Sequence, residues 1–306
     1  MVLSFSYSTF GKCILAGEHS VLRGVPAVVF PVFSKSLTLK YEPTNDNLQA
    51  WFSGETGSAF QLLFSGVVDQ ALKQLNLSRD KLKGQCFIDG NLPIGTGLGA
   101  SAALCVNVGM LFNHLGYVLK KDMYEFCRQL EDLFHGESSG VDIAAAVEGQ
   151  GIVFSRGGDW RKVKTTWQPH LYISYSGQVG ATSECVKQVK ALFDEDLEKA
   201  LQLDEQMAKA VEHVVGALES ESEDRLEKLV QGIQLAENCF DQWQLTRGSV
   251  GRHIQELKEE GALAAKPTGS GNGGFILSLW KDPPSKQAVD KFHLIDIHAG
   301  ASGSSS

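Results

Sequence analysis

At 306 residues, the chain has room for one large or two medium domains, and its 43% hydrophobic and 21% charged residues are typical of a globular protein with a sizeable core. A formal net charge of −8, without a cluster of Lys and Arg, argues against a general nucleic-acid-binding protein. The first ten residues lack a basic start, and no run of about 18 apolar residues occurs. We therefore expect a cytoplasmic protein that binds neither nucleic acid nor membrane.

The cysteines and histidines show no metal-binding pattern. There is no C-x-x-C pair and no H-E-x-x-H helix, so we expect buried thiols and no metal site made by the protein alone. The six scattered cysteines are Cys13, Cys86, Cys105, Cys127, Cys185 and Cys239.

The N-terminal region is predicted to build a sheet. Residues 3–41 carry short β-branched and aromatic runs broken by glycines, which predicts three or four antiparallel strands with turns near Gly11-Lys12 and Gly17. Apolar residues recur at helical spacing over residues 58–77, so a helix there would cover one face of the sheet. A strand over residues 85–89 then leads into a glycine-rich loop.

Three helices are predicted after this loop. The first covers residues 101–115 and is apolar on all sides, and the second covers residues 121–134 and is more amphipathic. The third should begin at Ser139, because Ser139 and Asp142 have the spacing of a capping box before an apolar run.

The second half changes character near residue 178. Strands over 151–155 and 171–175 are followed by long helices rich in Glu, Lys, Leu and Gln between residues 182 and 260. The last predicted strands cover residues 262–266, 275–280 and 293–298. Strands and helices without regular βαβ alternation predict an α+β fold. We expect domains over residues 1–178 and 179–298, and a flexible Gly/Ser-rich tail over residues 299–306.

The stretch from Asn91 to Leu104 is predicted to bind phosphate. Gly95, Gly97 and Gly99 allow positive φ and close approach of a ligand, so that main-chain N–H groups can converge on an anion at the start of the following helix. Ser101, the first hydroxyl of that helix, could then cap the helix or bind Mg²⁺. The alternative is a glycine-rich turn capped by Ser101.

Both glycine loops also match a dinucleotide fingerprint. The first, from Gly97, has the pattern G-x-G-x-x-A, and the second, from Gly269, has the pattern G-x-G-x-x-G. The second loop leads into a strand instead of a helix, and no acid follows the first loop at about 20 residues to bind a ribose. A nicotinamide or flavin enzyme is therefore the weaker alternative.

Three ionisable residues are candidates for chemistry at the loop, which has no lysine of its own. They are Lys12, Glu131 and Asp142. Each has a structural alternative: Lys12 as a solvated lysine of a hairpin, Glu131 as a surface acid, and Asp142 as the acid of the capping box. His19 and His135 can likewise be turn or surface histidines.

Taken together and in chain order, these stretches resemble the motifs of the GHMP kinases. The matching stretches are Lys12 to Val28, Pro93 to Ala103, Glu131 with His135 to Asp142, and Lys266 to Gly274. The resemblance implies a two-domain α+β kinase, with an N-terminal domain like the second domain of ribosomal protein S5 and a ferredoxin-like C-terminal domain.

The resemblance also implies roles for single residues. Asp142 would be the catalytic base and Lys12 would stabilise charge, while Ser101 and Glu131 would bind Mg²⁺. Phosphoryl transfer needs mainly positioning and charge stabilisation, which such a set can supply. The expected ATP contacts are Pro93, Gly95, Gly97, Leu98, Gly99, Ala100, Ser101 and Ala102, with Gly269, Gly271 and Gly273 in the last glycine loop.

The expected acceptor is a small alcohol that bears a carboxylate. Glu18, His19 and Thr182 stand where the family contacts its acceptor. The stretch Gly17-Glu18-His19 is not followed by the Thr-Asp that is typical of galactokinases. It is also not replaced by the Gly-Gly-Tyr of phosphomevalonate kinases. We therefore expect phosphorylation of the C5 hydroxyl of (R)-mevalonate by a monomer or homodimer. A kinase for another small alcohol, and a silent nucleotide-binding relative, are the alternatives.

The sequence departs from the family pattern at four positions. Ala100 replaces the first of two serines, Ser138 replaces a proline, and Pro267 and Asn272 make the last loop atypical. The contribution of that last loop is therefore the least secure of the implied roles.

Overall fold

The computed structural model describes residues 3–135 and 139–300. The chain forms two compact units that interleave along the sequence. The first unit comprises Met1–Gly11, Lys35–Ile94 and Gly99–Gly149, and the second comprises Lys12–Ser34, Gly95–Leu98 and Gln150–Ser306. The domain limits of 1–178, 179–298 and 299–306 stay a prediction, and residues 301–306 of the tail lie outside the described residues.

The sheet of the first unit is built on alternating burial. Its strands are parts of β1 (Phe5–Ala16) and β2 (Ala27–Asn47), with β3 (Gln49–Ser53) and β4 (Lys83–Gly90). In β4 every second residue is buried, among them Cys86 and Ile88, so one face of this strand contributes to the core. β4 pairs antiparallel with β2, where Leu37 lies opposite Gly90, and parallel with β3.

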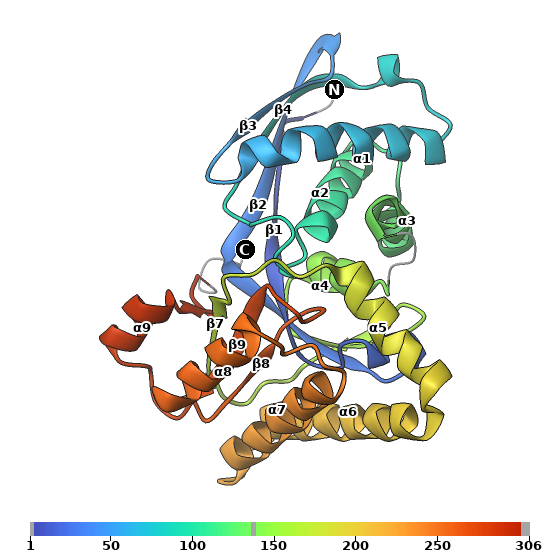
Figure 1. Ribbon diagram of the computed structural model, residues 1–306. Helices are drawn as coiled ribbons and strands as arrows, with labels where there is room; N and C mark the ends of the chain where they lie inside the picture. The colour runs from blue at the N-terminus through green and yellow to red at the C-terminus, as the bar shows by residue number, and fades with distance from the viewer. Residues whose placement is uncertain (1–2, 136–138, 301–306) are drawn as a thin grey trace. The chain divides into compact units, whose positions relative to one another are not determined.

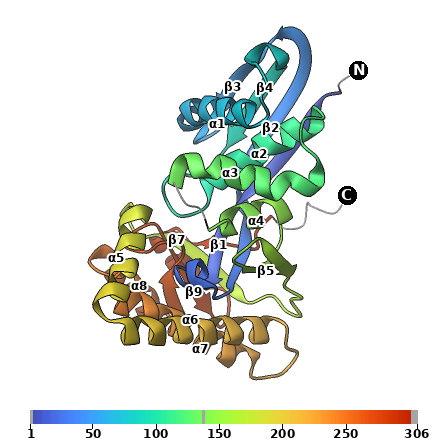
Figure 2. The ribbon, with the colours of Figure 1, turned by 90° about the vertical axis from the view of Figure 1, so that its right-hand side faces the viewer.

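Four helices pack against one another beside these strands (Figures 1 and 2). They are α1 (Phe60–Gln74), α2 (Ala100–His114), α3 (Met123–His135) and α4 (Val141–Glu148). α2 is the most buried, and its Asn107 amide donates to Thr9 Oγ1 at 2.7 Å and to the carbonyl oxygen of Leu37 at 2.9 Å. These buried hydrogen bonds fix α2 on the two long strands.

The second unit contains a four-stranded antiparallel sheet in the order β10-β7-β9-β8. Its strands are β7 (His170–Tyr175), β8 (Ala264–Pro267), β9 (Phe275–Trp280) and β10 (Ile295–Asp296). β9 is buried along its whole length and pairs with both β7 and β8. In the same unit, β5 (Ile152–Ser155) pairs with β2 and with β6 (Asp159–Lys162).

The helices of the second unit are amphipathic. They are α5 (Thr182–Glu195), α6 (Leu197–Leu218), α7 (Arg225–Gln242), α8 (Ser249–Glu259) and α9 (Lys286–Phe292). α6 and α7 run side by side, as Figure 1 shows. α8 buries Val250, Ile254 and Leu257 in one apolar cluster with Ala265 and Ile276 of the sheet.

The structure confirms the α+β fold and corrects several local predictions. Gly11-Lys12 forms no turn, because β1 continues through it to Ala16 in a fully buried run. The third helix begins at Val141, with Gly140 in the left-handed region as its N-cap, so the predicted start at Ser139 was wrong. The last strand covers only Ile295 and Asp296, and His293, its predicted start, is instead the left-handed C-cap of α9. β3, β6 and α9 were not predicted.

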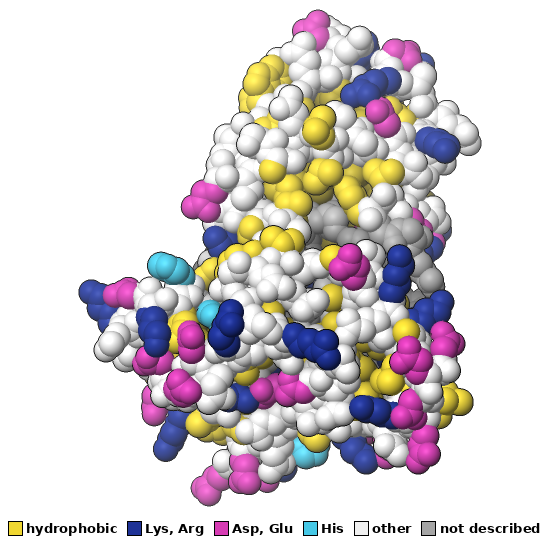
Figure 3. All heavy atoms as spheres, in the orientation of Figure 1, with side chains coloured by type: hydrophobic (Ala, Val, Ile, Leu, Met, Phe, Trp, Pro, Cys, Tyr) yellow, Lys and Arg dark blue, Asp and Glu magenta, His cyan; other side chains and the backbone are white. Residues whose placement is uncertain are grey.

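The distribution of charged side chains on the surface agrees with a composition in which acidic residues outnumber basic ones. On the face shown in Figure 3, acidic and basic side chains are interspersed over the surface without a large basic area. Among the residues that the structure describes, no helix is both long and apolar enough to span a membrane.

Candidate active site

The first glycine loop has the backbone that its sequence predicts. Gly95, Gly97 and Gly99 have φ of 76°, 86° and 75°, which only glycine adopts without strain. Gly99 is the N-cap of α2, so the loop ends at the start of a long helix. Ser101 is the second residue of this helix and Gly99 is its N-cap, so the interpretation of Ser101 as the N-cap was wrong. The loop therefore has the geometry that suits an anion.

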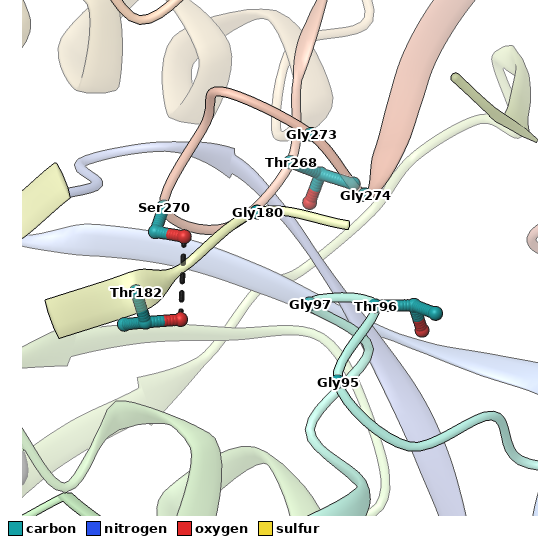
Figure 4. A pocket seen from close by; sticks show the side chains of 9 residues that line it. All are labelled: Gly95, Thr96, Gly97, Gly180, Thr182, Thr268, Ser270, Gly273 and Gly274. Atoms are coloured by element: carbon teal, nitrogen blue, oxygen red, sulfur yellow. Dashed lines mark hydrogen bonds between the residues drawn. The ribbon is translucent and has the colours of Figure 1, made fainter. Parts of the chain in front are cut away.

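A small pocket in the second unit is lined mainly by main chain and hydroxyl groups (Figure 4). Three segments that are far apart in the sequence line it: Gly95–Gly97, Gly180–Thr182 and the second glycine loop, residues 268–274. The lining residues are Gly95, Thr96, Gly97, Gly180, Thr182, Thr268, Ser270, Gly273 and Gly274. Two neighbouring residues of this lining are hydrogen-bonded, because Ser270 Oγ donates to Thr182 Oγ1 at 3.3 Å (Figure 4).

The two glycine loops approach each other main chain to main chain. A Cβ atom on Gly274 would lie 2.6 Å from the carbonyl oxygen of Thr96, and one on Gly97 would lie 3.2 Å from that of Thr268. Side chains at these positions would push the loops apart. The glycines are therefore needed for the shape of the pocket as well as for φ.

Lys12 lies beside the first glycine loop. Its main-chain N–H donates to the carbonyl oxygen of Leu98 at 2.9 Å, and its side chain is buried, with the residue 5% exposed. Because Lys12 lies inside strand β1, the alternative of a solvated lysine in a hairpin was wrong.

Glu18 forms a buried ion pair with Lys266, which lies just before the second glycine loop. The residues are 2% and 0% exposed, and Lys266 Nζ donates to Glu18 Oε1. Burial raises the pKa of Glu18, and the charge of Lys266 opposes this shift. Glu18 Oε2 is buried and has no hydrogen-bond partner among the described residues, so one carboxylate oxygen is an unsatisfied acceptor.

His19 is held in an unusual backbone conformation with φ of 57°. Its Nε2 atom lies 2.8 Å from the carbonyl oxygen of Ser270, and its ring packs edge-on against Phe240 and Trp243. Burial lowers the pKa of His19 to about 4, so the ring is neutral at pH 7. A neutral ring that donates from Nε2 presents Nδ1 as an acceptor.

The contacts that fix the short helix Ser20–Arg23 were not predicted from the sequence. Asp204 of α6 accepts from Ser20 Oγ at 2.6 Å and from both Nε and Nη2 of Arg23 at 2.6 Å. Arg23 also stacks over the ring of Phe193. These residues lie about 180 positions apart along the chain, so no local pattern marks them as partners.

The first unit holds the candidate metal ligands. Glu131 of α3 is only 2% exposed, so the alternative of a surface acid was wrong. Its charge contributes to the raised pKa of Cys105 and Cys127, after the larger effect of burial, which places it near Cys105 of α2. Ser101 lies one helical turn before Cys105 on the same side of α2. The described residues contain no group of three or more His, Cys, Asp or Glu arranged as a metal site.

Asp142 lies in the first turn of α4 and is half-buried. The capping-box alternative does not hold, because it requires Ser139 as the N-cap, whereas the N-cap is Gly140, which has no side chain. Ser139 Oγ instead accepts from the N–H of Val141 at 3.4 Å. The side chain of His135 lies outside the described residues.

The predicted site residues thus fall into two groups. Lys12, Glu18, His19 and Thr182 lie in the second unit together with Gly95–Leu98 and the second glycine loop, and Gly99, Ser101, Glu131 and Asp142 lie in the first unit. Within the second unit, the structure brings His19 and Thr182 together at Ser270. The proposed pairing of Lys12 with Asp142 stays a prediction.

Comparison with known families identifies the chain. The family model described as "GHMP kinases N terminal domain" matches residues 63–150. This range contains the first glycine loop, Ser101, Glu131 and Asp142. The mevalonate kinase of Pyrococcus horikoshii is 27% identical over 88% of this chain and 86% of its own length. Residues 63–150 thus match the N-terminal domain of the GHMP kinases, and the curated relatives that align with most of the chain are kinases. The chain is a kinase that uses ATP as a substrate, and the dinucleotide-binding alternative is set aside.

Solved structures confirm the GHMP kinase fold. The mevalonate kinase of L. major, solved in complex with R-mevalonate, has a TM-score of 0.77 at 22% identity and covers 98% of this chain and 92% of its own. The phosphomevalonate kinase of Streptococcus pneumoniae has a TM-score of 0.74 at 16% identity and covers 95% and 97%. A mevalonate kinase and a phosphomevalonate kinase thus both share this fold, so the fold alone does not select an acceptor.

Proposed function

We propose that this GHMP kinase transfers the γ-phosphoryl group of ATP to the C5 hydroxyl of (R)-mevalonate. The main support is the likeness to curated mevalonate kinases over most of both chains, such as the relative from Pyrococcus horikoshii. The second support is the first motif, Gly17-Glu18-His19, whose buried polar groups suit a small polar acceptor better than an apolar one. The product would be 5-phosphomevalonate, an isoprenoid precursor, together with ADP.

In this proposal Asp142 is the catalytic base. Its carboxylate accepts the proton of the acceptor hydroxyl as the oxygen attacks the γ-phosphorus and ADP leaves. Lys12 would keep Asp142 ionised and stabilise the negative charge that develops on the transferred group. The buried position of Lys12 beside the first glycine loop supports this role, because a cation is worth more where water is excluded.

Ser101 and Glu131 would hold Mg²⁺. Ser101 lies in the first turn of α2, and the charge of Glu131 acts on Cys105 of the same helix. A site with two protein ligands suits a cation that takes its other ligands from water and phosphates. Mg²⁺ bound there would neutralise charge on the ATP phosphates. This fits the lack of a larger ligand cluster among the described residues.

The ATP phosphates would bind at the two glycine loops. The N–H groups of residues 95–100, at the start of α2, are the expected cradle, flanked by Pro93 and Ala102. Gly269, Gly271 and Gly273 would close the site from the second loop. The pocket that the loops line is rich in main chain and hydroxyls, which are groups that suit phosphate oxygens.

The acceptor would bind to Glu18, His19 and Thr182. Glu18 Oε2 and the Nδ1 atom of a neutral His19 are both acceptors, so they suit the hydroxyl groups of mevalonate. Thr182 is exposed at the start of α5 and offers a hydroxyl that can donate to the carboxylate.

Two other functions are alternatives to this proposal. A kinase for another small alcohol, either phosphomevalonate or a sugar, is compatible with the fold, because a phosphomevalonate kinase matches it with a TM-score of 0.74. A silent nucleotide-binding relative is disfavoured, because Lys12, Ser101, Glu131 and Asp142 are all present.

The test is to identify the product. The protein is incubated with ATP, Mg²⁺ and (R)-mevalonate, and phosphorus NMR and mass spectrometry follow the phosphate. The proposal predicts one equivalent each of ADP and 5-phosphomevalonate. ATP binding without ADP release for any acceptor would instead support the silent relative.

A further inference from the structure

Lys266 is a buried lysine to which the proposed chemistry gives no role. Its side chain is fully buried, and its ammonium has three N–H donors. Three acceptors surround it: Glu18 Oε1, the carbonyl oxygen of Pro267 at 2.7 Å and that of Ile14 at 3.2 Å. No donor is left for a ligand, so Lys266 acts on the protein and not on a substrate.

The three acceptors come from two segments that are far apart in the sequence. Ile14 belongs to β1 and Glu18 to the turn that follows it, while Pro267 immediately precedes the second glycine loop. Two further hydrogen bonds join the same segments, because Thr268 Oγ1 accepts from the N–H of Ile14 at 2.8 Å and His19 donates to Ser270. Lys266 therefore lies at the base of the loop, where the loop meets β1.

We propose that Lys266 is a positioning residue, which holds the second glycine loop and the Glu18 carboxylate in place against the end of β1. The proposal rests on the proposed function, because the loop is where the nucleotide phosphates would bind. The loop carries Thr268, Ser270 and Gly274 to the pocket wall, so a shift at its base moves the groups that face the phosphates. A misplacement of about 1 Å in such a site can cost about 10²-fold in rate.

Variants of the charged pair Lys266 and Glu18 can separate the positioning role of Lys266 from a general effect on the stability of the fold. Lys266→Met leaves the Glu18 carboxylate buried without its cation, which destabilises the fold. The double variant Glu18→Gln/Lys266→Met removes both charges, so it should be more stable than Lys266→Met alone. The double variant still lacks the ammonium that binds the carbonyl oxygens of Ile14 and Pro267. The second glycine loop is therefore still not held against the end of β1.

A matched control comes from another ion pair in the same unit. Lys258 of α8 binds Glu237 of α7 at 2.6 and 2.8 Å, and Glu237 is 9% exposed. This pair joins two helices and contributes nothing to the pocket lining. Lys258→Met should therefore lower stability without changing the use of ATP.

The experiment measures KM for ATP, kcat and urea unfolding for wild type, Lys266→Met, the double variant and Lys258→Met, at a temperature where all are folded. We expect KM for ATP to rise about tenfold or more in both Lys266 variants, and to stay within about twofold in Lys258→Met. A double variant that folds and keeps the wild-type KM for ATP would overturn the proposal, as would an equal rise in Lys258→Met.

A second measurement keeps this test independent of the acceptor. Calorimetric titration with ATP alone gives an affinity that does not require turnover. If wild type binds ATP but does not phosphorylate mevalonate, the proposed function fails, and the role of Lys266 is still decided by its effect on ATP affinity. If Lys266→Met does not fold, the double variant decides the outcome.

Discussion

His19 and Ser270 are joined by a hydrogen bond although 251 positions separate them along the chain. The Nε2 atom of His19 lies 2.8 Å from the carbonyl oxygen of Ser270, and a carbonyl oxygen can only accept. Nε2 therefore carries a proton, and the neutral ring keeps Nδ1 as an acceptor. The residue proposed to bind the acceptor is thus attached to the loop proposed to bind the nucleotide.

This environment predicts a pH dependence of stability. Burial lowers the pKa of His19 from 6.5 to about 4, so between these pH values the unfolded chain binds more protons than the folded one. The contribution of His19 to stability is complete above about pH 6.5 and is lost as the pH falls to about 4. The full shift corresponds to about 3 kcal/mol.

NMR titration of the imidazole signals and urea unfolding at pH 7 and pH 4.5 check this prediction. Wild type should lose more stability than His19→Gln over this range. The comparison needs the variant, because burial also lowers the pKa of His253 and His298. A titration midpoint of His19 near 6.5 would contradict the prediction.

Asp142→Asn should nearly abolish turnover while ATP still binds. The amide keeps the shape of the side chain but cannot accept the proton, and general base catalysis is typically worth about 10²–10⁴-fold. Single-turnover kinetics and calorimetry with ATP measure the two effects separately. Asp122→Asn, at an exposed position just before α3, is the control. A kcat near that of wild type would remove Asp142 from the base role.

Ser101→Ala and Glu131→Gln should each weaken the use of Mg²⁺-ATP. Ser101→Ala removes a hydroxyl ligand, and Glu131→Gln replaces a charged carboxylate ligand by a neutral amide, so the Mg²⁺ concentration needed for half-maximal rate should rise. Glu125→Gln is the control on the same helix, because Glu125 is exposed and paired with Arg128. Kinetics at varied Mg²⁺ decide the matter, and unchanged Mg²⁺ dependence in both variants would exclude these residues as ligands.

Gly274→Ala should separate the two glycine loops. The new Cβ would lie 2.6 Å from the carbonyl oxygen of Thr96, whereas at Gly177, which has a similar φ of 79°, no atom lies within 4 Å. Gly177→Ala should cost only the strain of a positive φ, about 1–2 kcal/mol. Gly274→Ala should lower stability further and raise KM for ATP. Equal KM values for ATP in the two variants would show that this contact does not shape the site.

The predictions from sequence succeeded where local pattern decides the structure. The alternating glycines Gly95, Gly97 and Gly99 adopt positive φ and lead into a helix, because each requirement is met by neighbouring residues. Gly11 also suggested a turn, but there the burial of β1 overrides the local preference for a turn. A glycine can interrupt a strand or continue it, and only the packing of the strand decides between the two.

The remaining features depend on residues that are distant in the sequence. Lys266 binds Glu18 across 248 positions, and Arg23 binds Asp204 across 181. Each of these side chains, taken alone, has the character of an ordinary surface charge. Their role depends on burial and on the chain segment that packs beside them, which single-sequence periodicity does not reveal.

Acceptor specificity tests the central claim most directly. A coupled ADP-release assay compares kcat/KM for (R)-mevalonate, 5-phosphomevalonate, galactose and homoserine, with wild type and His19→Ala. We predict that mevalonate is at least about 10²-fold better than the others, because wrong acceptors leave buried polar groups unpaired, and that His19→Ala mainly impairs mevalonate use. Comparable turnover of 5-phosphomevalonate or galactose by the wild-type enzyme would contradict the assignment of mevalonate as the substrate.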